Sequence, residues 1–441
     1  MHPNGACRTK GLGVRIAVVG SGISGVTAAW LLAPAHEVTL LEAADRLGGH
    51  TNTVRLDLAD ETHQVDTGFI VHNRRNYPVF TSLLDRWGVE TQASEMTFSV
   101  SCAPSGLEYA GTTLSGIFAQ RRNLASPEFW LLLREIARFG RLGRRVLTAQ
   151  SATDLERAAA TGKTIGEFLD EHRFAPVFVE RYLVPLGSAV WSAGPATFVR
   201  FPLVSLLRFL DNHGLLTLTN RVPWRTITGG AKRYLAAATS SMHADIRLSS
   251  PVRTIRRDDD GVEVLTDRGS ERFDAVVCAV HTDQALRMLS DPSPAEREVL
   301  GAIAYTRNVA VLHTDEQMLP RSRRAWAAWN YHRPEGDVAL PTVTYLMNRL
   351  QRLESRSTIC VTLNREDEIR PEHVHARFEY DHPVFDHGAL AAQRRWSEIN
   401  GVRNTWYCGA WWGYGFHEDG AASGKRVADA LTPQHLRLVT R

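Results

Sequence analysis

The feature that most constrains the fold is a glycine-rich turn that follows a short apolar run near the start of the chain. Residues 14–19 (VRIAVV) are mostly apolar and β-branched, which favours a strand buried in a parallel sheet. The turn reads GSGISG over residues 20–25, and an apolar, helix-like stretch comes next. Gly20 permits a tight turn, Gly22 lets the backbone approach a pyrophosphate, and Gly25 lets the helix pack close to the strand. This order predicts a cradle for the phosphates of a dinucleotide at a helix N-terminus.

An acidic residue after a second predicted strand extends this site. Residues 37–41 are a β-like run that ends at Glu42, which lies 22 residues after Gly20. A carboxylate in this position is placed to hold the two hydroxyls of a ribose, and it would repel a 2′-phosphate. Glu42 therefore belongs to the predicted dinucleotide site. The backbone at Ser24, in the glycine-rich turn at the start of the predicted helix, belongs to the same site.

The segment after Glu42 indicates which dinucleotide binds. Residues 42–49 read EAADRLGG, so that Arg46, Gly48 and Gly49 follow the acid in the form ExxxRxGG. A second glycine pair beside an arginine extends the cradle along a cofactor longer than NAD. With these motifs the sequence resembles the FAD-binding superfamily of flavin amine oxidases, phytoene-type desaturases and protoporphyrinogen oxidase. The resemblance implies that Arg46, Gly48 and Gly49 lie by the pyrophosphate and ribityl chain of FAD.

Two further segments match the superfamily before the C-terminal region. VDTGFI at residues 65–70 contains Gly68 and Phe69, and the resemblance implies that this segment lies against the isoalloxazine ring. Residues 228–280 combine a Thr-Gly-Gly-Ala turn, a helix-like stretch and β-like runs. They resemble the middle cofactor segment of the superfamily, in which the backbone at Val252 is implied to bind adenine.

The last matching segment lies near the C-terminus. Gly409 precedes an aromatic stretch, and HEDGAASG at residues 417–424 then opens a predicted helix. The resemblance implies that the N-terminus of this helix points at the flavin. Backbone N–H groups near Gly420 and Ala421 would then stabilise negative charge at N1 and the C2 carbonyl. Either Glu418 or Asp419 is implied to contact the ribityl chain.

These segments predict an α/β fold class. A Rossmann-like FAD-binding domain of the glutathione-reductase-like type is expected from residues 13–70, 222–290 and 404–436. An α+β substrate-binding domain is expected from the intervening residues 71–221 and 291–403. The cofactor domain would thus be discontinuous and interleaved with the second domain.

Candidate acid or base residues are few, and the chain departs from amine oxidases at two of their usual positions. His72, His417 and Glu418 are the candidates for catalysis, with His213 as a further one, and each histidine also has a structural interpretation. Amine oxidases often place a lysine near flavin N5, but alignment puts Asn308 there and no lysine lies between residues 232 and 425. Phe416 falls where they place a second aromatic cage residue. These departures disfavour amine oxidation, whereas the FAD motifs are intact.

The resemblance can be narrowed to a bacterial branch of predicted NAD/FAD-binding proteins. It covers residues 14–431 and includes GYGFHEDG at residues 413–420. Members are commonly encoded beside cyclopropane-fatty-acyl-phospholipid synthase-like methyltransferases, which implies a hydrophobic small-molecule or fatty-acyl lipid substrate. We expect an FAD-dependent oxidoreductase that oxidises or desaturates an acyl chain. The alternatives are a redox-neutral fatty-acid double-bond isomerase, an amine oxidase, and a non-catalytic flavin-binding partner of a lipid methyltransferase.

Composition limits the partners and the compartment. The 441 residues carry 51 basic and 48 acidic side chains, a net charge of +3 that argues against a nucleic-acid partner. Five widely spaced cysteines form no CxxC pair, so neither a disulfide framework nor a metal site is expected. No signal peptide and no apolar run of about 18 residues is evident, which predicts a cytoplasmic protein.

One basic amphipathic segment adds a membrane hypothesis. Residues 129–147 read FWLLLREIARFGRLGRRVL, with apolar side chains on one helical face and arginines on another. Such a helix either contacts the inner face of a membrane peripherally, covers an acyl-chain channel, or is an ordinary surface helix. Gly140 and Gly143 are expected to weaken it.

Overall fold

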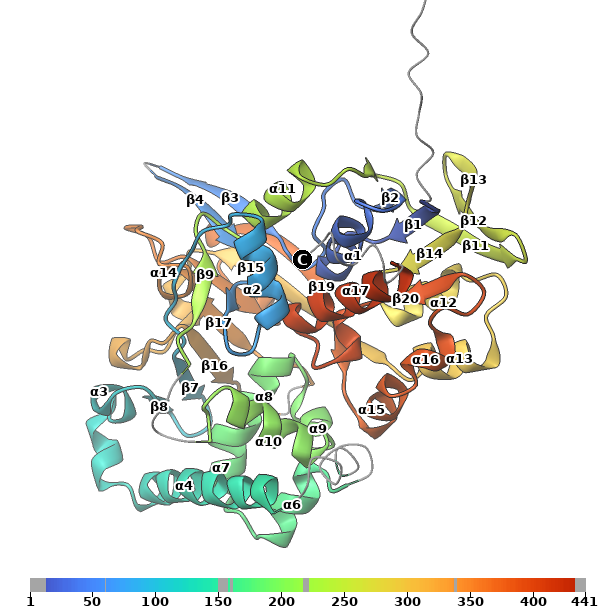
Figure 1. The fold of residues 1–441 in the computed structure, drawn as a ribbon. Helices are drawn as coiled ribbons and strands as arrows, with labels where there is room; N and C mark the ends of the chain where they lie inside the picture. Colours follow the sequence, from blue (N-terminus) through green and yellow to red (C-terminus); the bar gives the residue numbers. More distant parts are fainter. Residues whose placement is uncertain are drawn as a thin grey trace, which may run out of the picture. The chain divides into compact units, whose positions relative to one another are not determined.

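The computed structural model describes residues 13–59, 61–149, 158, 162–216, 222–336 and 339–432. The chain divides into two compact units, each assembled from separate parts of the sequence (Figure 1). Unit 1 contains the residues up to 49, residues 235–301 and those from 395 onward, and unit 2 contains residues 50–234 and 302–394.

Unit 1 is built on a parallel five-stranded sheet. Every neighbouring pair of its strands is parallel, and strands from three distant segments alternate within it. Ile16, Ala17 and Val18 in the central strand are fully buried, as the apolar run at the start of the chain predicts. The strand order is β10 (Asp245–Arg247), β2 (Glu37–Leu41), β1 (Arg15–Val19), β14 (Ala275–Cys278) and β20 (Thr405–Tyr407).

The first and last described helices of unit 1, α1 (Ile23–Leu32) and α17 (His417–Leu431), pack against each other at very short range. A Cβ built on Gly424 would lie 2.3 Å from the carbonyl oxygen of Ser24, and one on Gly420 would lie 2.6 Å from Ile23 Cγ2. Because residues four apart share a helix face, the two glycines form one flat strip against α1.

The rest of unit 1 is held by a buried ion pair. Arg257 donates to Glu296 at 2.5 Å and the Tyr407 hydroxyl donates to the same carboxylate at 2.6 Å, which ties three segments together. Arg257 has a fully buried side chain, and the hydrogen bonds from Arg257 and Tyr407 outweigh the effect of burial and lower the pKa of Glu296. The remaining elements are an antiparallel sheet of β11 (Val252–Asp258), β12 (Gly261–Thr266) and β13 (Gly269–Phe273), and helices α12 (Thr282–Met288), α13 (Pro294–Gly301) and α16 (Trp396–Ile399).

Unit 2 contains a mixed seven-stranded sheet. Its strands are antiparallel to their neighbours except for β16 and β7, which run parallel. The order is β19 (Val374–Val384), β15 (Ala304–His313), β18 (Cys360–Leu363), β17 (Val343–Leu346), β16 (Trp329–Arg333), β7 (Phe98–Cys102) and β8 (Leu107–Ala110). A hairpin of β3 (Thr53–Leu58) and β4 (Glu61–Asp66) and a small sheet of β5 (Val71–His72), β9 (Arg225–Ile227) and β6 (Thr91–Ala93) complete the strands.

The longest helix of unit 2 is α4 (Pro127–Thr148), which covers the predicted amphipathic segment. Its apolar face, including Phe129, Leu132 and Phe139, is buried against neighbouring helices. The other helices of unit 2 are α2 (Pro78–Arg86), α3 (Leu114–Ile117), α6 (Ile165–Glu171), α7 (Pro176–Phe178), α8 (Val184–Trp191), α9 (Pro195–Phe198), α10 (Leu203–Asn212), α14 (Met347–Leu350) and α15 (His387–Gln393), and α11 (Lys232–Ser240) runs from unit 2 into unit 1.

The predicted α/β class is confirmed. The two compact units have limits that differ from those of the predicted domains. Residues 50–70 and 222–234, predicted with the cofactor domain, group with unit 2, because the Asp66 carboxylate accepts from Ala231 N at 2.9 Å and from Gln351 Nε2 at 2.7 Å. Residues 291–301 and 395–403 group with unit 1. The predicted boundaries at 221 and 436 lie outside the described residues, and the functional domain limits stay a prediction.

Among the described residues, no helix is both long enough and apolar enough to cross a bilayer.

We predict that Gly424→Ala destabilises unit 1 by about 1–3 kcal/mol, because its methyl group would be forced into the backbone of α1. The measurement is urea unfolding of the apoprotein. Gly301→Ala is the matched control, since it is also helical and its Cβ would meet nothing within 4 Å. Equal stability of the two variants would contradict the close α1–α17 contact.

Candidate cofactor site

The predicted phosphate cradle lies between β1 and α1 in unit 1. Gly20 has a φ of +98°, a left-handed conformation that favours glycine, and its N–H donates to the carbonyl of Leu41 at 2.8 Å. A Cβ on Gly25 would lie 1.9 Å from the Gly20 carbonyl oxygen. The first and third glycines of the motif are therefore required by the fold itself, which brings the start of α1 onto the end of β1.

The second glycine has a different environment. A Cβ on Gly22 would meet no atom within 4 Å, and one on Gly49 would have Gly22 Cα as its nearest neighbour at 3.5 Å. Gly22 is also the N-cap of α1 and makes no side-chain capping bond, so the first N–H groups of the helix have no side-chain acceptor there. An open space bordered by two glycines and an uncapped helix N-terminus fits the pyrophosphate of a dinucleotide.

Glu42 is oriented by the cradle. Its Oε2 accepts from Ser21 N at 2.9 Å and from Ser21 Oγ at 2.5 Å, and its Oε1 accepts from Ala44 N at 2.9 Å. A carboxylate has about four acceptor positions, and these three bonds leave about one of them for a ribose hydroxyl. The role of Ser21 was not predicted, because the glycine motif leaves that position free.

The ExxxRxGG segment folds back onto the same turn. Gly48 N donates to both the carbonyl and the hydroxyl oxygen of Ser21 at 3.1 Å, and Arg46 Nη2 donates to the Gly49 carbonyl at 3.0 Å. Arg46 is exposed at this point of unit 1. The structure thus brings Arg46, Gly48 and Gly49 beside Gly22, as a shared cradle requires.

The segment with Val252 also begins beside Glu42. The N–H groups of Ser249 and Ser250 donate at 2.8 Å to the carbonyls of Ala44 and Glu42. Val252, the first residue of β11, lies two residues further on. Its predicted contact with adenine is therefore near the ribose end of the cradle.

The terminal motif forms the other side of this cofactor site. Gly409 N donates to Ser423 Oγ at 2.9 Å, and Gly420 and Ala421 are buried in the first turns of α17. The Asp419 carboxylate accepts from Phe416 N at 2.9 Å, and burial raises the pKa of Asp419 to about 7. His417 is buried and Glu418 half-buried in the same first turn. The tight packing of α1 on α17 is a second reason why glycine is needed at position 420. The resemblance alone did not reveal this packing requirement.

The remaining predicted residues lie in unit 2. A Cβ on Gly68 would lie 2.0 Å from the His50 carbonyl oxygen, and Phe69 N donates to that oxygen at 2.9 Å. His72 is buried on β5 near the rings of Phe69 and Phe80, and burial together with Arg225 and Arg74 lowers its pKa to about 4. His72 is therefore a neutral imidazole at neutral pH.

His213 is held by a hydrogen bond and by ring stacking within unit 2. Its Nδ1 lies 2.7 Å from the Phe209 carbonyl oxygen, and its ring stacks on Trp224 with 5.5 Å between centroids. Burial lowers the pKa of His213. These contacts favour the structural interpretation of this histidine.

Asp66 is a buried residue that the sequence did not single out. Its carboxylate accepts from Thr53 Oγ1 at 2.5 Å as well as from Ala231 and Gln351, and burial raises its pKa to about 7. It fixes the segment that carries Gly68 and Phe69 to the Thr-Gly-Gly turn at 228–230. The sequence signal was present in the Asp-x-Gly pattern, but the partners are far away in the chain.

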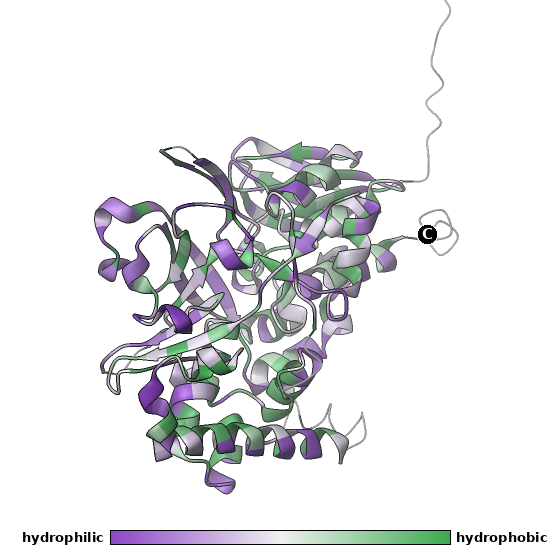
Figure 2. Cartoon of the chain, turned by 90° about the vertical axis from the view of Figure 1, so that its left-hand side faces the viewer, coloured by the Kyte–Doolittle hydropathy of each residue, from purple (hydrophilic) through white to green (hydrophobic). Residues whose placement is uncertain are grey.

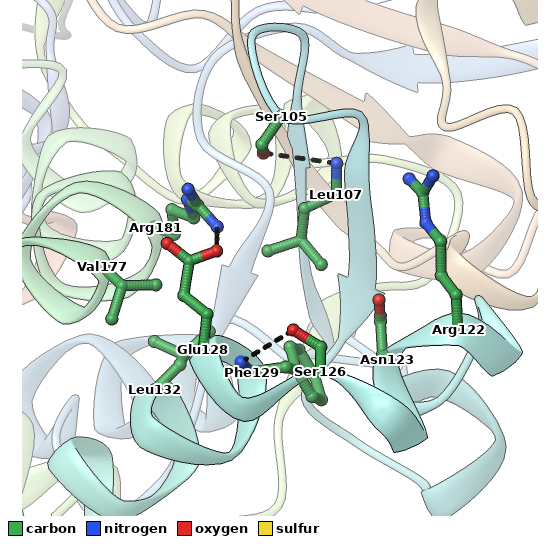
Figure 3. A pocket seen from close by; sticks show the side chains of 10 residues that line it. All are labelled: Ser105, Leu107, Arg122, Asn123, Ser126, Glu128, Phe129, Leu132, Val177 and Arg181. Atoms are coloured by element: carbon green, nitrogen blue, oxygen red, sulfur yellow. Dashed lines mark hydrogen bonds and ion pairs between the residues drawn. The ribbon is translucent and has the colours of Figure 1, made fainter.

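One pocket of about 170 Å³ lies in unit 2, and the residues that line it are shown in Figure 3. Leu107, Phe129, Leu132 and Val177 form its apolar walls, beside the ion pair of Arg181 and Glu128. No predicted site residue lines this pocket, so it is separate from the candidate cofactor site.

This geometry fits the pyrophosphate and ribose of a dinucleotide. Residues 23–432 match the family described as flavin containing amine oxidoreductase. The chain therefore belongs to that family of flavin-containing proteins, which confirms the resemblance inferred from its motifs.

Individual similar proteins span several activities. Carotenoid phi-ring synthase of Streptomyces griseus is 27% identical over 328 residues, which are 71% of this chain but 60% of that protein. The fatty acid isomerase of P. acnes that produces CLA superposes with a TM-score of 0.69 at 17% identity, over 95% of this chain and 99% of that one. Putrescine oxidase bound to putrescine gives 0.66 at 17% identity, over 98% and 100%. The two superpositions show a shared fold.

We predict that Gly22→Ala weakens FAD binding at least about tenfold while the apoprotein unfolds like wild type. The φ of −60° at Gly22 suits alanine and its Cβ meets no protein atom, but it would point into the predicted pyrophosphate space. Fluorescence titration of the apoprotein with FAD gives the affinity, with Gly301→Ala as control. Wild-type affinity in Gly22→Ala would show that the phosphates bind elsewhere.

We predict a pH-dependent stability contribution from Asp419. Its folded pKa of about 7 lies above the ordinary aspartate value of 3.8, so the folded state prefers the protonated carboxyl. The stabilising contribution is complete below about pH 4 and is lost as the pH rises towards 7. Thermal unfolding of the apoprotein should therefore show Asp419→Asn gaining stability relative to wild type between pH 5 and pH 8. A constant difference over this range would contradict the shifted pKa.

Proposed function

We propose that this protein removes hydride from carbon in an apolar substrate, and that the substrate is a fatty-acyl lipid which becomes oxidised or desaturated. The observation that carries the proposal is the burial and hydrogen bonding of Asn308. This residue occupies the position where amine-oxidising relatives place a lysine. Asn308 lies on β15 with a fully buried side chain.

The hydrogen bonds of Asn308 leave little room for a proton-transfer role. Its Nδ2 donates to the Thr306 carbonyl at 3.0 Å and lies 3.1 Å from His382 Nδ1. Its Oδ1 accepts from Asn364 Nδ2 at 2.8 Å. An amide held in this way carries no charge and does not titrate near neutral pH, which supports chemistry without the lysine of an amine oxidase.

The predicted base in unit 2 is also uncharged. His72 is 1% exposed, its pKa is about 4, and its Nδ1 has no hydrogen-bond partner among the described residues. A neutral imidazole with a free ring nitrogen is a proton acceptor. The aromatic rings of Phe69, Tyr77 and Phe80 lie beside His72. These largely apolar surroundings suit an uncharged substrate better than a cationic amine.

Two of the similar proteins support an apolar substrate class. One is named for a carotenoid ring and another for a fatty acid. The first of them is similar over 71% of this chain.

The chain's own residues would divide the work as follows. The glycines of the cradle and Glu42 bind and orient the dinucleotide, and bound FAD would supply a hydride acceptor. Desaturation breaks two adjacent C–H bonds and forms one C=C bond, so that one hydride and one proton leave the substrate. His72 would accept the proton at its free Nδ1, and the surrounding rings would exclude water.

The test is anaerobic mixing of the FAD-loaded protein with phospholipids that carry saturated or monounsaturated acyl chains, and separately with putrescine. We expect loss of the oxidised flavin absorbance with the lipid, together with a product lighter by two hydrogens in mass spectrometry. Bleaching by putrescine alone would overturn the proposal in favour of amine oxidation. Shifted double bonds without lasting bleaching would instead favour isomerisation, and a bound flavin without any product would favour the non-catalytic partner.

We predict that His72→Gln slows flavin reduction by the substrate by about 10²-fold or more, because the proton acceptor is lost. FAD content should stay at the wild-type level. His63→Gln is the matched control, since His63 lies in the same unit and pairs with Glu61 at 2.7 Å. Stopped-flow reduction rates that are equal in the two variants would exclude His72 as the base.

A further inference from the structure

The sequence suggested that the apolar face of the predicted amphipathic helix could contact a membrane. In the structure, this apolar face of α4 is buried and the opposite face is exposed. Phe129, Leu132 and Phe139 of α4 are between 0% and 3% exposed, so these side chains cannot enter a membrane. Gly140 and Gly143 do not end the helix, because their missing side chains make room for Leu216 and Leu207. What remains outside is the opposite face of α4.

The outer face of α4 carries one tryptophan followed by arginines. Trp130 is 50% exposed, and Arg134, Arg141 and Arg145 are exposed on the same side of the helix. Spacings of four, seven and four residues place all four side chains on one stripe. Figure 2 shows hydrophilic and hydrophobic residues alternating along this helix, at the lower edge of the view.

Exposed apolar side chains from the preceding segment lie next to this stripe. Leu124 is 53% exposed, and its carbonyl accepts from Trp130 Nε1 at 2.9 Å. Leu114 is 76% exposed at the start of α3. Phe118 directly follows that helix, and its ring lies 5.7 Å from that of Trp130. We call these six exposed residues the α4 face: Leu114, Leu124, Trp130, Arg134, Arg141 and Arg145.

The segment that contains the α4 face is much more basic than the chain as a whole. Residues 113–149 contain seven arginines and two glutamates, a net charge of +5, whereas the complete chain carries +3. Glu135 is buried and pairs with Arg138 at 2.9 Å and more weakly with Arg134 at 3.8 Å, and Glu128 pairs with Arg181 at 2.8 Å. Within the described ranges, Arg141 and Arg145 form no ion pair, so the outer face keeps its positive charge.

We propose that the α4 face is a docking surface for an anionic phospholipid bilayer. Exposed leucine and tryptophan side chains insert at the boundary between headgroups and acyl chains, while arginines pair with lipid phosphates. Aliphatic side chains gain nothing from stacking on bases, so this composition favours a membrane over a single-stranded nucleic acid. The proposal concerns binding and does not depend on which reaction the flavin site catalyses.

The test uses the full-length, FAD-loaded protein and vesicle sedimentation. One vesicle preparation contains phosphatidylcholine alone, and the other contains phosphatidylcholine with about 30% phosphatidylglycerol. We expect sedimentation with the anionic vesicles, little with the neutral ones, and loss of binding as salt rises because the charges are screened.

Two variants identify the surface. R134E/R141E/R145E should lower partitioning onto anionic vesicles at least about tenfold, and Trp130→Ser should lower it several-fold at the same salt concentration. R297E/R377E/R394E is the matched control, since these arginines are exposed on other elements and the change in net charge is the same. Flavin absorbance and thermal unfolding verify that each variant is folded.

The proposal would be overturned by the absence of sedimentation of wild type with anionic vesicles or by equal losses in the α4 and control variants. A Trp130-dependent dimer in light scattering without vesicle binding would also overturn it. Binding of a single-stranded oligonucleotide in place of vesicles would assign the face to nucleic acid and would equally overturn it.

Discussion

The steric contact between the start of α1 and its neighbours is the constraint on which unit 1 depends. Gly25 approaches the Gly20 carbonyl, and Gly424 approaches the carbonyl of Ser24, at distances that leave no space for a Cβ. These contacts hold the helix so close to β1 and α17 that its N-terminus opens onto the space beside Gly22. The anion-binding property of that N-terminus is therefore a consequence of backbone packing as much as of the residues that surround it.

The polar groups inside both units show how the chain tolerates buried charge. Arg257 and Glu296 remain charged because each satisfies the other, whereas the pKa values of Asp66 and Asp419 move to about 7 because burial disfavours the carboxylate. His72 is held neutral for the same reason. The interior thus favours neutral forms wherever no counter-ion is present, which is an environment suited to a reaction on an uncharged substrate.

The sequence predicted the cradle well because glycine requirements are local. The positions of Gly20, Gly22 and Gly25 follow from one turn of a few residues, and Glu42 follows from the end of the neighbouring strand. The described geometry agrees with both expectations. Asp66 was missed because its partners Ala231 and Gln351 are 165 and 285 residues away.

The helix α4 shows the limit of periodicity. The pattern located an apolar stripe but could not say what covers it, and helix propensity at Gly140 and Gly143 was overridden by the packing of Leu207 and Leu216. The catalytic assignments of His72, His417 and Glu418 stay predictions, since no local pattern distinguishes a base from a buried structural histidine.

The strand order of unit 1 has a consequence for biosynthesis. β1 pairs with β14 in a register that joins Ile16 to Ala275, and β14 in turn pairs with β20 near residue 406. A ribosome that has made the glycine-rich turn must still make every residue up to β20 and α17 before these two elements can pack beside it. Contacts of such high sequence separation form late and slowly. The parallel sheet and the packing of α1 on α17 therefore cannot be completed until the residues of β20 and α17 have been synthesised.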